Sequence, residues 1–136
     1  ILCSGWMSAL APLYLKKAYN NEPFFAHSKI VLMLDNEEYT KPFGTKFAEK
    51  LRIDGISNTD VRSIAGFPVG YEELMRLAVD YSDAVVYASP QVNQRVMNYA
   101  ETKGKPILPF EEYKNENEFC KRQWEFFQTL LDKTNE

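Results

Sequence analysis

Two uninterrupted apolar runs limit the folds open to this chain more than any other feature of its sequence. Residues 29–34 and 84–88 carry apolar side chains at nearly every position, without the polar alternation of a strand that has one wet face. Such runs are typical of parallel strands buried on both faces. Because amphipathic helical segments separate them, the sequence predicts an α/β class, with a parallel sheet of three or four strands flanked by helices.

The first fifteen residues predict a strand, a turn and a helix. Apolar residues recur at intervals of three and four over residues 5–18, as in an amphipathic helix. Pro12 would kink this helix if Ser4 were its N-cap. If Ser8 were the cap, Pro12 would fall in the first turn, where amide donors lack partners anyway.

The rest of the chain continues the alternation of helices and strands. Ser89 followed by Pro90 is typical of a helix start, and Gly104 of a helix end. Asn58 or Thr59 is expected to cap a short helix. The pattern predicts helices opening near residue 42 and covering 59–64, 74–81, 90–100 and 117–132, with an edge strand at 106–109. In the last helix, one face would hold Cys120, Trp124, Phe127 and Leu131.

Composition limits the class of protein further. The 136 residues suit a single domain, 1–136, with a globular content of 45% hydrophobic residues. A net charge of -3 gives no field that would favour nucleic acid, and no apolar run is long enough to cross a membrane. Cys3 and Cys120 form no CxxC motif, which favours a reducing, cytoplasmic location, and His27 is the single histidine, so no structural zinc site is expected. The chain starts at Ile1 inside an apolar run, and we interpret it as a piece of a longer protein.

Three loops are expected to line a crevice. In open α/β sheets, ligands bind at the carboxyl ends of the strands. Here those ends lead into Ser4-Gly5, residues 35–41 and Ser89-Pro90. Many unrelated proteins share this geometry, so it does not by itself identify a ligand.

Three motifs in series carry a family resemblance. The segment from Trp6 to Leu15 resembles the His-x-His-Asp-Trp-x-Ser/Thr-Ala/Gly-Leu-x-Pro-x-Tyr-Leu turn of bacterial glycogen synthases and plant starch synthases. Asp35-Asn36-Glu37-Glu38-Tyr39 resembles the family's His-Asn-x-x-Tyr. Residues 81–85 and Ser89-Pro90 resemble a later strand and the Ser-Pro pair that follows it. The chain is therefore similar to the second half of the N-terminal domain of a two-domain, Rossmann-like GT-B glycosyltransferase.

The resemblance implies an activity for the intact enzyme. Family members transfer glucose from a sugar nucleotide, usually ADP-glucose in bacteria, to an α-1,4-glucan acceptor, with no metal or other cofactor. The N-terminal domain mainly contacts the acceptor. Leu2, Ser4, Gly5 and Asp35 stand where the family has three histidines and an aspartate that face substrate. We therefore assign no catalytic residue, expect this chain to be inactive without the remainder of the GT-B protein, and leave the parent's activity open.

The candidate ligand-binding residues lie in the three crevice loops: Ser4, Gly5, Trp6, Asn36, Tyr39 and Ser89. Each has a structural alternative. Ser4 and Ser89 are typical helix caps, Trp6 could pack in the core, Asn36 could serve a turn, and Tyr39 could cover its loop instead of stacking on a sugar. Glu37 and Glu38 invite comparison with the paired carboxylates of glycosidases, but adjacent residues in an extended loop point apart.

Two other functions remain open from the sequence. One is a catalytically silent α-glucan-binding or regulatory module that has kept the fold. The other is a flavodoxin-like interaction domain, which predicts a complete five-stranded sheet. A fragment instead predicts fewer strands, with an apolar edge or face left open and therefore self-association.

Overall fold

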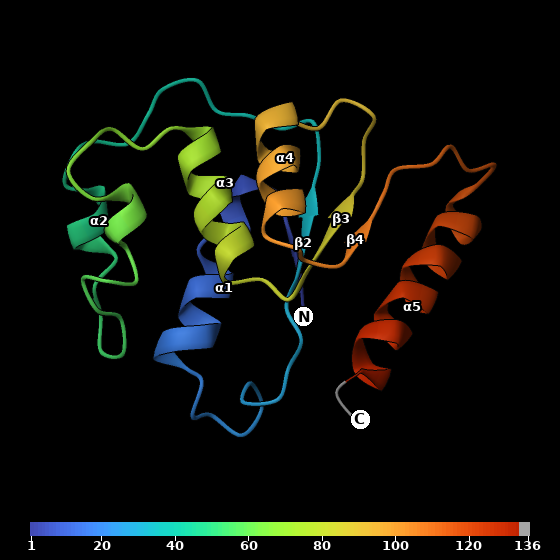
Figure 1. Cartoon of the computed structure of the whole chain (residues 1–136), viewed down its shortest axis with the longest axis horizontal. Coiled ribbons are helices and arrows are strands. Elements are labelled where there is room, and N and C mark those ends of the chain that lie inside the picture. Colours follow the sequence, from blue (N-terminus) through green and yellow to red (C-terminus); the bar gives the residue numbers. More distant parts are fainter. Residues whose placement is uncertain (134–136) are drawn as a thin grey trace.

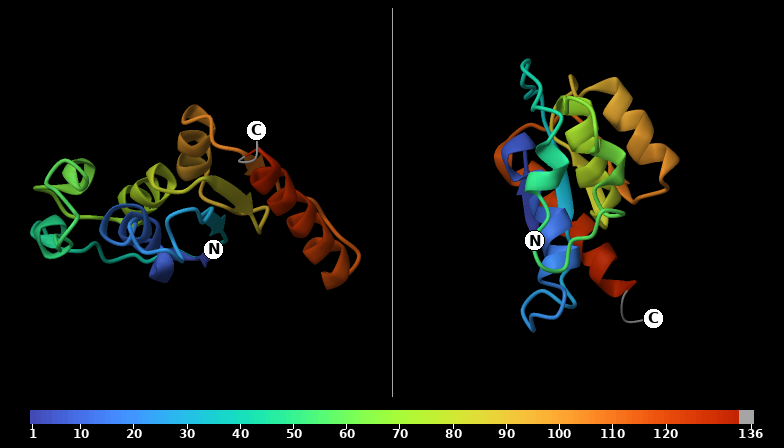
Figure 2. Two further views of the ribbon diagram at one scale, coloured as in Figure 1. Left: turned by 90° about the horizontal axis from the view of Figure 1, so that it is seen from below. Right: turned by 90° about the vertical axis from the view of Figure 1, so that its left-hand side faces the viewer.

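A computed structural model describes residues 1–133 and shows a four-stranded parallel sheet between layers of helices (Figures 1 and 2). The strands follow one another across the sheet in chain order: β1 (Leu2–Ser4), β2 (Val31–Leu34), β3 (Ala84–Tyr87) and β4 (Ile107–Leu108). All three strand pairs are parallel. The predicted class, the two buried central strands and the Pro-flanked edge strand are confirmed.

The two faces of the sheet are covered by different helices. Alternate strand residues, including Leu32 and Val85, pack under α1 (Ala11–Leu13), α3 (Tyr71–Asp80) and α4 (Gln94–Thr102). The intervening positions Val31, Ala84 and Val86 form a smaller cluster with Leu130 of α5 (Glu116–Asp132). Figure 2 shows α5 on the side of the sheet opposite α3 and α4. Burial on both faces explains why β2 and β3 lack polar alternation.

The helix predicted over residues 5–18 is broken into three short pieces. A 3-10 helix, η1 (Trp6–Ser8), precedes α1, and a π-helical turn, η2 (Tyr14–Ala18), follows it. Pro12 lies in the first turn of α1, as one alternative predicted. Neither Ser4 nor Ser8 is the cap: Gly5 precedes η1, Leu10 precedes α1, and the Ser8 hydroxyl donates back to the Ser4 carbonyl oxygen.

The connection from β2 to α3 is less helical than predicted. The helix expected from residue 42 begins later, as α2 (Phe47–Lys50), because Phe43 is held in an antiparallel bridge to Val69. The next short helix, η3 (Arg62–Ile64), has Val61 as its N-cap, so the expected capping by Asn58 or Thr59 is wrong. Phe43 lies before α2 and Phe47 is its first residue, and their rings stack with centroids 4.5 Å apart. The spacing of four between them therefore arises from ring stacking and not from a shared helix.

Ser89 does not start the fourth helix. Asn93 caps α4 by accepting hydrogen bonds from the amides of Arg95 and Val96. The Ser89 hydroxyl instead accepts from the Gln91 amide, which forms a turn ahead of the helix. Gly104 follows the helix with a positive φ of 68°, as predicted for a helix end.

The packed face of α5 differs from the predicted one. Trp124 is 64% exposed and Leu131 is 47% exposed, whereas Leu130 and Gln123 are buried. Phe126 and Phe127 pack beside Leu130 against the sheet. The large apolar residues of this helix go almost all the way round it, so periodicity alone could not choose the face.

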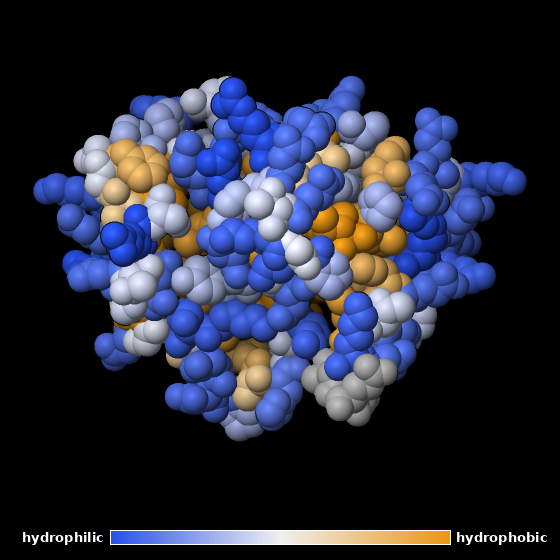
Figure 3. All heavy atoms as spheres, in the orientation of Figure 1, coloured by the Kyte–Doolittle hydropathy of each residue, from blue (hydrophilic) through white to orange (hydrophobic). Residues whose placement is uncertain are grey.

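Apolar surface remains exposed near β1 and α5. Ile1 and Leu2, at the β1 edge, are each close to half exposed. A hollow of about 450 Å³ separates this edge from Trp124, Phe127 and Leu131 of α5. Figure 3 also shows hydrophobic side chains at the surface between β4 and α5. Within residues 1–133, no helix has the length and apolar character needed to cross a membrane. Self-association stays a prediction.

Two adjacent leucines provide a test of the α5 packing. Leu130→Ala should lower the free energy of unfolding by about 2–4 kcal/mol, because it leaves a cavity between α5 and the sheet. Leu131→Ala, at a half-exposed position, should cost roughly 1 kcal/mol or less. Urea denaturation of both variants measures the difference. Equal losses would contradict this packing of α5.

Candidate functional site

The register of the sheet brings the three predicted loops to one edge. Ser4 is opposite Met33 and Leu34 is opposite Tyr87, so β1, β2 and β3 end close together. The Gly5 amide donates to the Met33 carbonyl oxygen at 3.3 Å, which extends the first pair by one residue. The chain therefore leaves all three strands at the same edge of the sheet, which is where the sequence predicted the crevice.

Aromatic rings connect the first loop to the second. The ring centroids of Trp6 and Tyr39 lie 5.0 Å apart in an edge-to-face arrangement. Tyr39 also contacts Phe43 and Tyr71, at 5.2 and 6.1 Å, and its hydroxyl donates to the Val69 carbonyl oxygen at 3.1 Å. Trp6 and Tyr39 are half-buried, so each packs on the core and still presents some surface. Their role toward a ligand stays a prediction.

Two amide side chains connect the second loop to the third. Asn36 is exposed and donates from Nδ2 to Gln91 Oε1 at 2.9 Å. Asn93 donates from Nδ2 to Glu38 at 2.9 Å and to Glu72 of α3 at 3.3 Å, while its Oδ1 caps α4. Asn93 thus holds the loop after β2, the start of α4 and the start of α3 together.

The predicted separation of Glu37 and Glu38 is confirmed. Glu38 turns toward Asn93, while Glu37 turns toward Gly5. A Cβ atom placed on Gly5 would lie 3.0 Å from Glu37 Oε2. Because the two carboxylates serve different neighbours, they do not form a facing glycosidase pair.

The crevice is acidic. Residues 4–6, 35–41 and 89–93 include three carboxylates and one basic residue, Lys41. Arg95, just beyond the third loop, pairs with Glu72 at 3.5 Å. Burial, followed by the charges of Glu38, Glu37 and Asp35, raises the pKa of Tyr71 to about 12. Burial, followed by the charge of Glu73, likewise raises the pKa of Tyr39 to about 12.

Sequence reasoning identified four of the main contributors and missed three. Trp6, Asn36, Tyr39 and Gly5 meet in the crevice, whereas Ser4 is exposed at the end of β1 and Ser89 is engaged in its own turn. The missed residues are Gln91, Asn93 and Glu72. An asparagine three residues before Val96 is an N-cap signal, but the neighbouring Ser89-Pro90 pair drew the predicted helix start away from it. No cluster of His, Cys, Asp and Glu within residues 1–133 is arranged to hold a metal ion.

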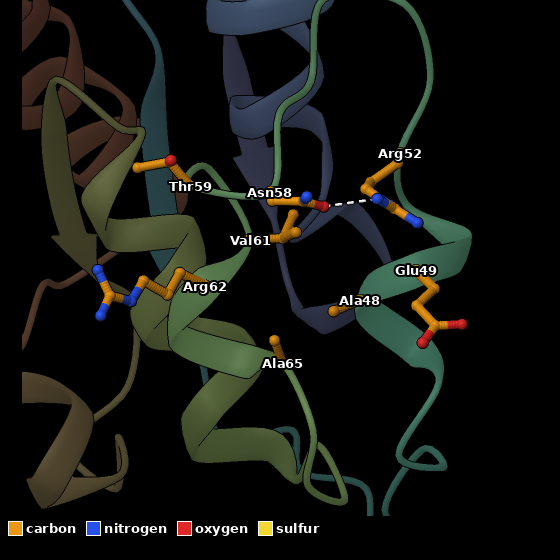
Figure 4. A pocket seen from close by; sticks show the side chains of 8 residues that line it. All are labelled: Ala48, Glu49, Arg52, Asn58, Thr59, Val61, Arg62 and Ala65. Atoms are coloured by element: carbon orange, nitrogen blue, oxygen red, sulfur yellow. Dashed lines mark hydrogen bonds between the residues drawn. The ribbon is translucent and has the colours of Figure 1, made fainter.

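A separate hollow of about 390 Å³ lies between α2 and η3. Ala48, Val61 and Ala65 form its apolar part, and Arg52 bonds to Asn58 at its rim (Figure 4). The Arg62 side chain points away from Arg52 in Figure 4, so the two guanidinium groups form no shared anion site. None of the three crevice loops contributes to this hollow.

Comparison with known proteins finds one matching family. The family described as "Starch synthase catalytic domain" matches residues 1–106, which include β1, β2 and β3 and end one residue before β4. α5 lies outside the matched residues. No solved structure gives a significant match.

Several curated proteins are also similar. The glycogen synthase of Aeromonas salmonicida is 25% identical over 97 residues, covering 71% of this chain and 19% of that protein. The glycogen synthase of Thermotoga maritima is 28% identical over 94 residues, covering 68% of this chain and 18% of that protein. That of Aeromonas hydrophila is 24% identical over 98 residues. The chain thus spans about a fifth of the length of these relatives.

Tyr71 should make the protein sensitive to alkali. In the unfolded chain its pKa is about 10, so between pH 10 and about 12 the unfolded state loses this proton first, and stability falls as pH rises. Tyr71→Phe should flatten that fall in urea midpoints measured across this range. Equal slopes for Tyr71→Phe and the unmodified protein would contradict the assignment.

Asn93 should order the crevice loops as well as α4. Asn93→Ala should cost about 1 kcal/mol from the lost cap and should speed amide hydrogen exchange over residues 35–39. The matched control is Asn115→Ala, which removes the α5 cap accepting from Glu118. That variant should lose similar stability without changing exchange in the crevice. A change in the loop that both variants share would contradict the specific role of Asn93.

Proposed function

Because this chain belongs to the starch synthase catalytic domain family, we propose that it forms the acceptor side of the substrate cleft in a glycogen or starch synthase-like glycosyltransferase. Residues 1–136 would be one α/β unit of a larger catalytic domain, half of a GT-B N-terminal domain. The proposal depends chiefly on one observation: Trp6 and Tyr39 meet in the same crevice where Asn36 and Gln91 are bonded.

The chemistry of the crevice favours a neutral sugar. Aromatic rings offer apolar faces to the C–H groups of a glucose ring. Carboxylates accept hydrogen bonds from its hydroxyls, and side-chain amides both accept and donate them. Trp6 and Tyr39 would supply the rings, and Asn36 would bond a hydroxyl. An α-1,4-glucan offers both kinds of surface in every glucose unit.

The charge of the crevice disfavours the nucleotide. A diphosphate is strongly anionic, and the three carboxylates of the loops, which outnumber their single cation, Lys41, would repel it. Transfer from ADP-glucose also requires positioned donors that stabilise the departing diphosphate. In the intact enzyme those groups would come from outside this chain. We therefore expect the chain to bind an α-glucan and to be inactive in transfer by itself.

Binding of maltoheptaose tests the proposal directly. Titration of the chain, followed by amide chemical shifts, should move signals of residues 4–6 and 35–39, whereas ADP-glucose should leave these signals in place. Asn36→Ala should weaken maltoheptaose binding about fivefold, in line with one lost hydrogen bond of about 1 kcal/mol.

A matched variant separates binding from general damage. Asn98 is also exposed and also bonds a glutamine side chain, Gln94, at 2.9 Å, but it lies on α4. Asn98→Ala should bind maltoheptaose as the unmodified chain does. If maltoheptaose moved no crevice signal, the acceptor proposal would be wrong.

A silent glucan-binding module is the second candidate, and one observation favours it. Leu2 and Ser4 stand where the family motif has histidines. Ser4 is exposed at the end of β1, and no imidazole replaces the lost ones, since the single histidine, His27, lies in the loop before β2. Glucosyl transfer from ADP-glucose to glycogen by the intact protein would exclude this candidate. Glycogen binding without turnover would support it. For either candidate we propose a cytoplasmic location, which suits two unpaired cysteines.

A further inference from the structure

We propose that the Glu37 carboxylate takes the place of the aspartate that the family motif carries at position 5, and that it contacts the hydroxyls of the acceptor glucan. This inference rests on the proposed function and adds to it a specificity-determining residue. It also gives the change from Asp to Gly at position 5 a structural partner in the neighbouring loop.

The backbone of Gly5 disfavours a side chain at this position. Gly5 has φ 73° and ψ 174°, a combination that is essentially restricted to glycine. A side chain at this position would be strained, and its Cβ would lie 3.0 Å from Glu37 Oε2. The volume into which a side chain of residue 5 would extend is therefore already occupied by a carboxylate oxygen.

The Glu37 carboxylate is available to a ligand. The other crevice carboxylates are engaged: Asp35 accepts from the Asn36 amide, Glu38 from Asn93, and Glu72 from Asn93 and Arg95. Within residues 1–133, no hydrogen bond or ion pair is seen for Glu37, which is exposed. Its two oxygens are thus open to an incoming ligand.

Glu37 is close in the chain to one ring of the Trp6–Tyr39 pair and lies beside the loop that carries the other. The Glu37 carboxylate belongs to the loop that carries Tyr39, and it lies beside Gly5, which immediately precedes Trp6. An ionised carboxylate accepts strong hydrogen bonds from hydroxyl groups and donates none. Glu37 would therefore select a ligand rich in hydroxyls and reject anionic sugars.

The charge of Glu37 can be removed with little change in shape. Glu37→Gln should raise the Kd for maltoheptaose at least tenfold and leave the thermal midpoint unchanged, since no protein contact depends on the charge. Glu38→Gln is the control on the same loop: its amide oxygen can still accept from Asn93, and its Kd should change less than twofold. A purely structural role for Glu37 would move the midpoint instead of the Kd.

The proximity of Gly5 and Glu37 has its own readout. A Cβ atom at residue 5 would strain the backbone and displace the Glu37 carboxylate, so Gly5→Ala should lower the thermal midpoint and also raise the Kd for maltoheptaose. An unchanged Kd in Glu37→Gln, when the unmodified chain binds maltoheptaose, would overturn the proposed replacement. If the unmodified chain bound no maltoheptaose, the acceptor proposal and this one would both be wrong.

Discussion

The parallel register of β1, β2 and β3 is the constraint on which the rest of the site depends. Because Ser4 is opposite Met33 and Leu34 is opposite Tyr87, the three strands end at the same edge of the sheet. That register is maintained by burial, since a shift of one residue would move Leu32 and Val85 from the face covered by α3 to the face covered by α5. The packing of the sheet thus determines the place of the crevice, although most core residues never touch it.

The crevice itself is held by side chains from the loops and from the starts of α3 and α4. The edge-to-face pair of Trp6 and Tyr39 fixes the first loop against the second, and the amides of Asn36 and Asn93 fix the second loop against the third. Asn93 has the widest reach, because one amide group both caps α4 and binds carboxylates from two other segments. Such a surface can present rings and hydrogen-bonding groups to a sugar without any positive charge.

The altered motif has a different meaning once the loops are placed. In the sequence, Ser4, Gly5 and Asp35 read as three separate losses of polar groups that face substrate. In the structure, Gly5 and Glu37 are neighbours, and the glycine has a backbone conformation that other residues avoid. We propose that Glu37 supplies to the acceptor site the carboxylate that residue 5 lacks. The histidine positions, by contrast, have no such substitute among the residues of the crevice loops.

By itself, the sequence determined the α/β class, the two central strands, the three loops at the crevice and the family, because continuous apolar runs and ordered motifs are local patterns. It could not determine which face of α5 packs, because apolar residues surround that helix and only contact with Val31 and Val86 selects Leu130 over Leu131. Nor could it bring Asn93 to Glu38 and Glu72, or Glu37 to Gly5. These outcomes depend on residues far apart in the chain, whose approach is set by the packing of the sheet and its helices.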